Sequence, residues 1–235
     1  MDMVLTLDGR DKATKFLQYL ARLLAWYYAG TAQQERFASF KESLTTSRKA
    51  FRFGRSIIEM HRLKEHFKKI KSIGVLESVL HSIRYFGLAG FWLMDNTNFL
   101  YGSGVLDSFR LDRKDRIQQR KTLQSQASKL ANQSYFAGSV AGFWINWKAL
   151  RAFQKLNHNA TDNKKSPEEC TKLRAKYFAL WAALLKSTCD ILVFSNMPGL
   201  DLWKTYHGAK MNELVHCMAG LTSASVVLYK NYPTA

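Results

Sequence analysis

Hydrophobic residues recur every three or four positions along most of this chain, which is the spacing of an amphipathic helix. No long stretch alternates between apolar and polar residues with the period of two that marks a strand. The whole sequence holds only three prolines, so few positions force a helix to break. The pattern therefore predicts an all-α protein, whose first helix ends near Gly30.

The strongest amphipathic pattern lies in residues 37–71, which the spacing predicts as one helix. At about 100° per residue, its apolar side chains fall on one arc and its many cations on the other. The apolar arc holds Phe40, Leu44, Phe51, Ile57 and Ile58, and the basic arc holds Lys41, Arg48, Lys49, Arg52 and Arg55. Such a helix packs on a protein core, binds nucleic acid or lies in the interface of an anionic membrane, and the pattern alone leaves these open.

Three later stretches are apolar enough for helices buried in protein or in a membrane. Residues 73–94 are long enough to span a bilayer but carry Glu77, His81 and Arg84, so both settings fit. Residues 130–147 and 214–229 are uncharged, and the aromatic residues beside 214–229 make it the best candidate for a spanning helix. Small residues at helical spacing are ordinary packing in a soluble bundle, whereas in a membrane they indicate self-association, here at Gly138, Gly142, Gly220 and Ala224.

A polar run at residues 157–166 is the best linker candidate. Directly after it, Ser166 and Pro167 followed by two Glu form a helix start, and the sequence Asn-Met-Pro-Gly at 196–199 ends that helix. The Lys and Arg of the amino-terminal part favour the cytosolic side of a membrane. We therefore expect a cytosol-facing amphipathic region at residues 1–72 and a membrane-associated helical region at 73–235 that contains the linker.

The formal net charge of +17 points to an acidic partner, either nucleic acid or anionic lipid. No zinc-finger, helix-turn-helix or RNA-binding motif occurs, so the sequence indicates no nucleic-acid partner. Hydropathy is intermediate in every long segment, which is typical of a protein partly embedded in a bilayer. The expected fold is a helical membrane-associated bundle with an amphipathic interfacial helix and one or more hydrophobic membrane helices.

Residues that could support catalysis or bind metal lack the spacing that either chemistry needs. His61 and His66 point about 140° apart on a helix, so they cannot share a metal ion. Neither paired carboxylates nor a glycine-rich phosphate loop is present, and the three cysteines are too widely spaced for a disulfide framework. The sequence predicts no enzyme activity, no metal site and no cofactor.

Four blocks of sequence, spread over nearly the whole chain, resemble the peroxin-eleven family of peroxisomal membrane proteins. They are GRDK with the following QY and R in residues 9–22, SRKAFRFGR at 47–55, the segment from YF to GSG at 85–104, and CD with the later AGLTSA in 189–224. This chain has Phe99 where the family usually has Trp. The overall length also agrees with the family.

The resemblance implies a membrane protein of peroxisomes, or of a specialised peroxisome such as a glycosome, that elongates the organelle before fission. It implies that both termini face the cytosol, that copies form homo-oligomers and that organelle-division factors are recruited. The helix around residues 48–55 would insert into the cytosolic leaflet, its apolar arc entering the anionic phospholipid membrane while Arg48, Lys49, Arg52 and Arg55 hold headgroups. A pore for small metabolites is the alternative activity.

Overall fold

The computed structural model describes residues 7–69, 74–106, 115–158 and 167–231, and the regular structure in these ranges is entirely helical. The helices are α2 (Leu7–Tyr27), α3 (Ala32–Phe51), α4 (Arg55–Lys69), α5 (Val75–Ser103), α7 (Arg116–His158), α8 (Pro167–Ser195), α9 (Leu202–His207) and α10 (Glu213–Asn231). The all-α prediction is confirmed. The first helix ends before Gly30, and α8 begins and ends where the proline and turn signals place it.

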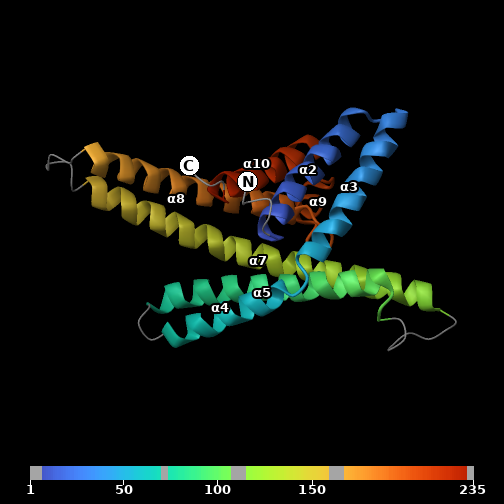
Figure 1. Cartoon of the computed structure of the whole chain (residues 1–235), viewed down its shortest axis with the longest axis horizontal. Helices are drawn as coiled ribbons and strands as arrows, with labels where there is room; N and C mark the ends of the chain where they lie inside the picture. The colour runs from blue at the N-terminus through green and yellow to red at the C-terminus, as the bar shows by residue number, and fades with distance from the viewer. Residues whose placement is uncertain (1–6, 70–73, 107–114, 159–166, 232–235) are drawn as a thin grey trace.

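The long helix α7 runs through the middle of the molecule, with α5 along one side and α8 along the other (Figure 1). α4 packs on α5, while α2 and α3 form a hairpin whose α2 arm lies against α10. α10 also packs on α8. Because the helices meet in pairs, the buried apolar clusters are small, and one of them consists of Phe91, Trp92 and Ala131. Many large apolar side chains therefore stay exposed.

The amphipathic stretch 37–71 is not one helix, as the spacing predicted, but two. α3 ends at Phe51, and α4 begins at Arg55. Gly54 lies between them with a φ of 78°, a left-handed conformation that breaks the helix and costs glycine little. The break sends the two halves to different partners, because α3 packs on α2 and α4 packs on α5.

Glycines allow α5 and α7 to touch through their backbones. A Cβ added at Gly87 would lie 2.6 Å from the Ser134 carbonyl oxygen and 2.8 Å from the Cα of Gly138. Gly142 is buried nearby, facing the side chains of Arg84 and Ser187. The close approach expected of the G-x-x-x-G sequence is thus present, but between two helices of one chain.

The other two positions predicted for self-association are also used within the chain. A Cβ at Gly220 would lie 2.2 Å from the Tyr19 ring, so Gly220 lets α10 approach α2. Ala224 is fully buried. These four residues thus pack against helices of their own chain, and a role for them in contacts between copies stays a prediction.

Within the described residues, α8 alone is long and apolar enough to cross a membrane, over Glu168–Ser195. Only 28% of that apolar stretch is buried, whereas the core helix of a soluble protein is mostly buried. Residues 214–229, expected to be the best candidate for a spanning helix, do not reach the same length and apolarity. Those sixteen residues extend only about 24 Å as a helix, and they include buried His216 and Ser223.

The linker predicted at 157–166 falls mainly on residues 159–166, which lie outside the described residues, and positions 157–158 belong to α7. The division at residue 72 stays a prediction. Both sides of it are packed together, since α2 contacts α10 and α4 contacts α5.

Candidate functional site

A buried carboxylate of α2 organises the junction where α3 ends. Asp11 is fully buried and lies 3.1 Å from Arg48 Nε and 2.7 Å from Arg52 Nε, and Arg52 also reaches Asp95 of α5 at 3.3 Å. Burial alone would raise the pKa of Asp11, but the charges of Arg52 and Lys12 outweigh it and hold that pKa below its usual value. Asp11 is therefore a charged anchor that ties α2, α3 and α5 together.

This anchor changes the roles expected for the basic arc. Arg48 and Arg52 point into the protein, toward Asp11, rather than toward lipid headgroups. Lys49 donates to the Asn98 side chain, and the Arg55 guanidinium lies 4.8 Å from the Trp92 ring. The periodicity of a single helix could not predict that Arg48 and Arg52 are paired, because the acids that bind them come from α2 and α5.

The residues of the predicted apolar arc also differ in how far they are exposed. Phe40, Ile57 and Ile58 are exposed, while Leu44 and Phe51 are half-buried. The exposed residues of α4 thus remain available for a membrane, and the end of α3 is largely occupied by the fold.

A second buried cluster joins four helices around Asp190 of α8. Its carboxylate accepts hydrogen bonds from Lys186 at 2.6 Å, Ser223 at 2.6 Å, Tyr135 at 2.9 Å and Lys15 at 3.2 Å. These partners come from α8, α10, α7 and α2, so a single carboxylate links them all. The sequence pattern did not predict this cluster, although Lys186 and Asp190, four positions apart in a largely apolar part of the helix, are a usable signal.

A third cluster surrounds His216 of α10. Arg22 Nη2 lies 3.0 Å from Glu213 Oε2, and Arg22 Nη1 lies 2.8 Å from His216 Nε2. Burial and then the Arg22 charge lower the pKa of His216 to about 4, against the weaker opposite effect of Glu213. His216 is therefore neutral at physiological pH, and its Nε2 accepts from Arg22.

We expect the folded protein to lose stability as pH falls from about 6.5 to about 4. The unfolded chain protonates His216 near pH 6.5 while the folded chain does not, so the unfolded state binds more protons in that window. The lowered pKa values of Asp11 and Glu213 act in the same direction at lower pH. Thermal unfolding in detergent at stepped pH measures this. His216→Gln should flatten the upper part of the profile, and an unchanged profile would contradict the assignment.

An exposed apolar surface covers the hairpin of α4 and α5. Its α5 part falls within a 100° arc of the helix, and Ile57, Met60 and Phe67 of α4 extend it across the Phe67–Phe86 ring contact at 6.0 Å. We call this the α4–α5 apolar surface: Ile57, Met60, Phe67, Val75, Leu76, Val79, Ile83, Phe86 and Leu93. The exposed fraction of the side chain reaches 73% at Ile57 and 83% at Val75. Single exposed apolar residues are ordinary, but a group of them marks an interaction site. Three cations of α4, Arg62, Lys64 and Lys68, are also exposed, and two of them pair with acids of the same helix, Arg62 with Glu59 and Lys68 with Glu65.

The charged groups of α5 lie away from this surface. Glu77 reaches Lys148 of α7 at 3.8 Å, and His81 faces His66 of α4 at a ring distance of 5.7 Å. His66 itself contacts Ser82 at 3.2 Å. His61 is exposed on the same helix. One face of α5 thus packs against protein, and another is apolar and exposed.

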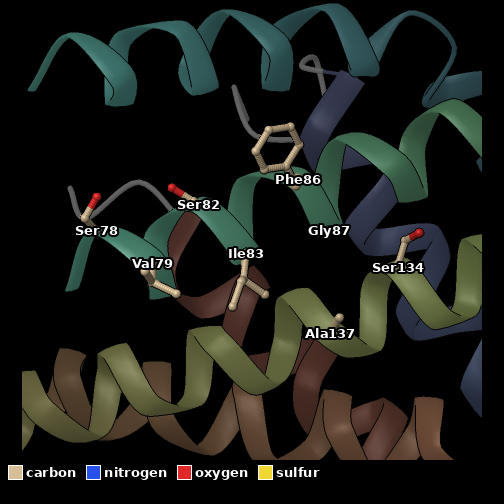
Figure 2. A pocket seen from close by; sticks show the side chains of 8 residues that line it. All are labelled: Ser78, Val79, Ser82, Ile83, Phe86, Gly87, Ser134 and Ala137. Atoms are coloured by element: carbon tan, nitrogen blue, oxygen red, sulfur yellow. The ribbon is translucent and has the colours of Figure 1, made fainter. Parts of the chain in front are cut away.

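A groove of about 500 Å³ lies between α5 and α7 and overlaps the apolar surface (Figure 2). Three serine residues and the side chains of Val79, Ile83 and Phe86 line it, together with Gly87 and Ala137. None of the lining residues carries a charge or a titratable group of the kind that catalysis uses. The groove is thus part of the α4–α5 apolar surface, since Val79, Ile83 and Phe86 belong to both.

Comparison with known proteins decides the family. The family model Peroxisomal biogenesis factor 11 (PEX11) matches residues 1–232. The chain belongs to the PEX11 family. It is 22% identical to Peroxisomal membrane protein 11B of Arabidopsis thaliana over 231 residues, which is 97% of this chain and 93% of that protein. It is 31% identical to Peroxisomal membrane protein 11-3 of Oryza sativa subsp. japonica over 111 residues, 47% of this chain and 43% of that protein. No solved structure matches the chain.

PEX11 membership makes this a peroxisomal membrane protein with a part in peroxisome proliferation. The four blocks that carry the PEX11 resemblance supply most of the buried charges described above. Asp11 and Arg22 come from the first block, Arg48 and Arg52 from the second, and Asp95 from the third. In this PEX11 structure the first three blocks therefore meet as ion pairs, Asp11 with Arg48 and Arg52, and Arg52 with Asp95.

Proposed function

We propose that this chain elongates the peroxisomal membrane, and so promotes fission, by inserting the α4–α5 apolar surface into one leaflet. A wedge confined to one leaflet expands it relative to the other and favours positive curvature. The observation that carries the proposal is the set of exposed apolar side chains on two packed helices, joined at the Phe67–Phe86 contact. A pore for small metabolites would need a polar passage, whereas this surface is apolar and faces outward.

The expected energies are sufficient for stable insertion. Burying each large apolar side chain contributes roughly 1.5–3 kcal/mol when it is fully desolvated. Each Lys or Arg close to an anionic surface adds about 1 kcal/mol. Exposed Lys64 can supply this term, whereas Arg62 and Lys68 are exposed but pair with Glu59 at 2.8 Å and Glu65 at 2.6 Å. Arg48 and Arg52 are held in buried ion pairs.

The test places two acids on the apolar surface of the full-length protein. Ile57→Glu with Met60→Glu should reduce the number of tubules formed from anionic liposomes roughly tenfold or more. The two substitutions remove about 3 kcal/mol of apolar burial. Half of that free energy already corresponds to a tenfold change in membrane binding. Electron microscopy of the liposomes counts the tubules, and circular dichroism checks that the fold is kept.

A matched control carries the same charge change elsewhere. Val105→Glu with Ile117→Glu alters two exposed residues outside the apolar surface and should leave tubulation intact. Undiminished tubulation by the α4 variant would refute leaflet insertion by this surface. Release of a trapped small dye from the same liposomes, without tubules, would instead support a pore.

A further inference from the structure

One end of the α7–α8 pair is strongly cationic. The last turns of α7 and the first turns of α8 carry five exposed cations, and the acids in the same turns are Glu168 and Glu169. We call the five residues the cationic end: Arg151, Lys155, Lys172, Arg174 and Lys176. α8 lies on the opposite side of α7 from α4 (Figure 1), and none of the five residues belongs to the α4–α5 apolar surface.

Aromatic side chains lie directly next to these cations. The Arg151 guanidinium is 4.8 Å from the Trp147 ring, and the Lys176 ammonium is 5.6 Å from the Phe153 ring. Phe153 stacks on Tyr177 at 6.2 Å, which sets these turns of α7 and α8 at the same level. Exposed Trp144 and Trp181 follow one or two turns further along the two helices. Cations, then aromatic rings, then apolar residues is the order found across a bilayer interface.

The length of α8 beyond this level suits a bilayer. From Tyr177 to Ser195 the helix extends about 27 Å, close to the ~30 Å of a hydrocarbon core. Its last turn holds no basic residue, and the exposed aromatic residues Trp203 and Tyr206 follow in α9. The helix therefore has aromatic residues near both ends, but a concentration of positive charge at its first turns.

We propose that the cationic end binds anionic phospholipid headgroups and fixes the level of the bilayer surface along α7 and α8. The aromatic rings beside it sit at the headgroup boundary, and the apolar part of α8 enters the hydrocarbon. This inference rests on the membrane localisation of the protein and is independent of leaflet insertion by α4 and α5.

Cys170 provides a native reporter for the test. It is exposed and lies two positions before Lys172, whereas Cys189 and Cys217 are buried. A thiol-reactive fluorophore on the folded, full-length protein should therefore attach mainly at Cys170. Energy transfer from this fluorophore to headgroup-labelled phosphatidylserine, divided by transfer to headgroup-labelled phosphatidylcholine, measures the enrichment of anionic lipid around the cationic end in mixed vesicles.

The native chain should give a ratio of at least about threefold, which falls as salt is raised. The variant Arg151→Gln, Lys155→Gln, Lys172→Gln, Arg174→Gln and Lys176→Gln should bring the ratio close to one. A control variant with the same change of charge at other exposed cations, Arg36→Gln, Lys121→Gln, Lys129→Gln, Lys204→Gln and Lys210→Gln, should keep it.

Three results would overturn the proposal. A native ratio near one, at low and high salt alike, would show no preference for anionic lipid. Equal ratios in the two five-residue variants would place the preference elsewhere. Weak transfer to either lipid would put this end in water, as expected if it bound an acidic protein. The salt series uses the native chain alone, so the proposal remains testable even if a variant does not fold.

Discussion

Replacing Asp190 with asparagine is expected to destabilise the folded protein by about 3–5 kcal/mol, the usual cost of removing one partner from a buried ion pair. The substitution would leave Lys15, which is largely buried, and Lys186, about a third of whose side chain is exposed, without their shared anion. The hydrogen bonds from Tyr135 and Ser223 would also weaken. In a chain of this size that loss corresponds to a fall in Tm of roughly 6–20 °C, which intrinsic tryptophan fluorescence in detergent would detect.

Two further variants make this result specific. Glu42→Gln removes an acid from an exposed pair with Lys41 and should change stability by less than about 1 kcal/mol. Lys186→Met added to Asp190→Asn should recover part of the loss, because one uncompensated cation is removed. A native-like Tm for Asp190→Asn, or no recovery in the double variant, would show that the cluster does not stabilise α8 as described.

The apolar periodicity was sufficient to predict the helices but not their partners. It identified α2 and α8 because glycine, proline and capping residues mark their ends. It failed at Gly54, since a single glycine inside a strong amphipathic pattern is compatible with either a continuous or a broken helix. Packing decides between them, because α4 can reach α5 only after the chain turns.

The candidate site could likewise be predicted only in part from the sequence. Exposed Ile57 and Ile58 follow from the pattern of α4 itself, so the sequence could propose them for lipid contact. The buried pairing of Arg48 and Arg52 could not be predicted, because Asp11 lies 37 positions from Arg48 in the chain. Small residues posed the same problem: their spacing indicates close approach of two helices without identifying the second helix.

Replacing Gly87 with alanine is expected to destabilise the fold by about 2 kcal/mol. Overpacking in a well-packed interior costs about 1–3 kcal/mol, and the upper part of that range applies here because the nearest atoms belong to the backbone of α7. Alanine gains about 1 kcal/mol over glycine within a helix, which offsets part of the cost. Thermal unfolding of the purified protein measures the difference.

Gly142→Ala is the matched control, on the helix that faces Gly87. Its added Cβ would lie 3.9 Å from the nearest atoms, the side chains of Arg84 and Ser187, which is ordinary contact. With no clash to oppose the helix preference of alanine, this variant should be neutral or more stable than the native chain. Similar losses in both variants would mean that α5 and α7 do not meet at Gly87. The opposite signs expected here therefore distinguish packing within the chain from the self-association that the spacing alone suggested.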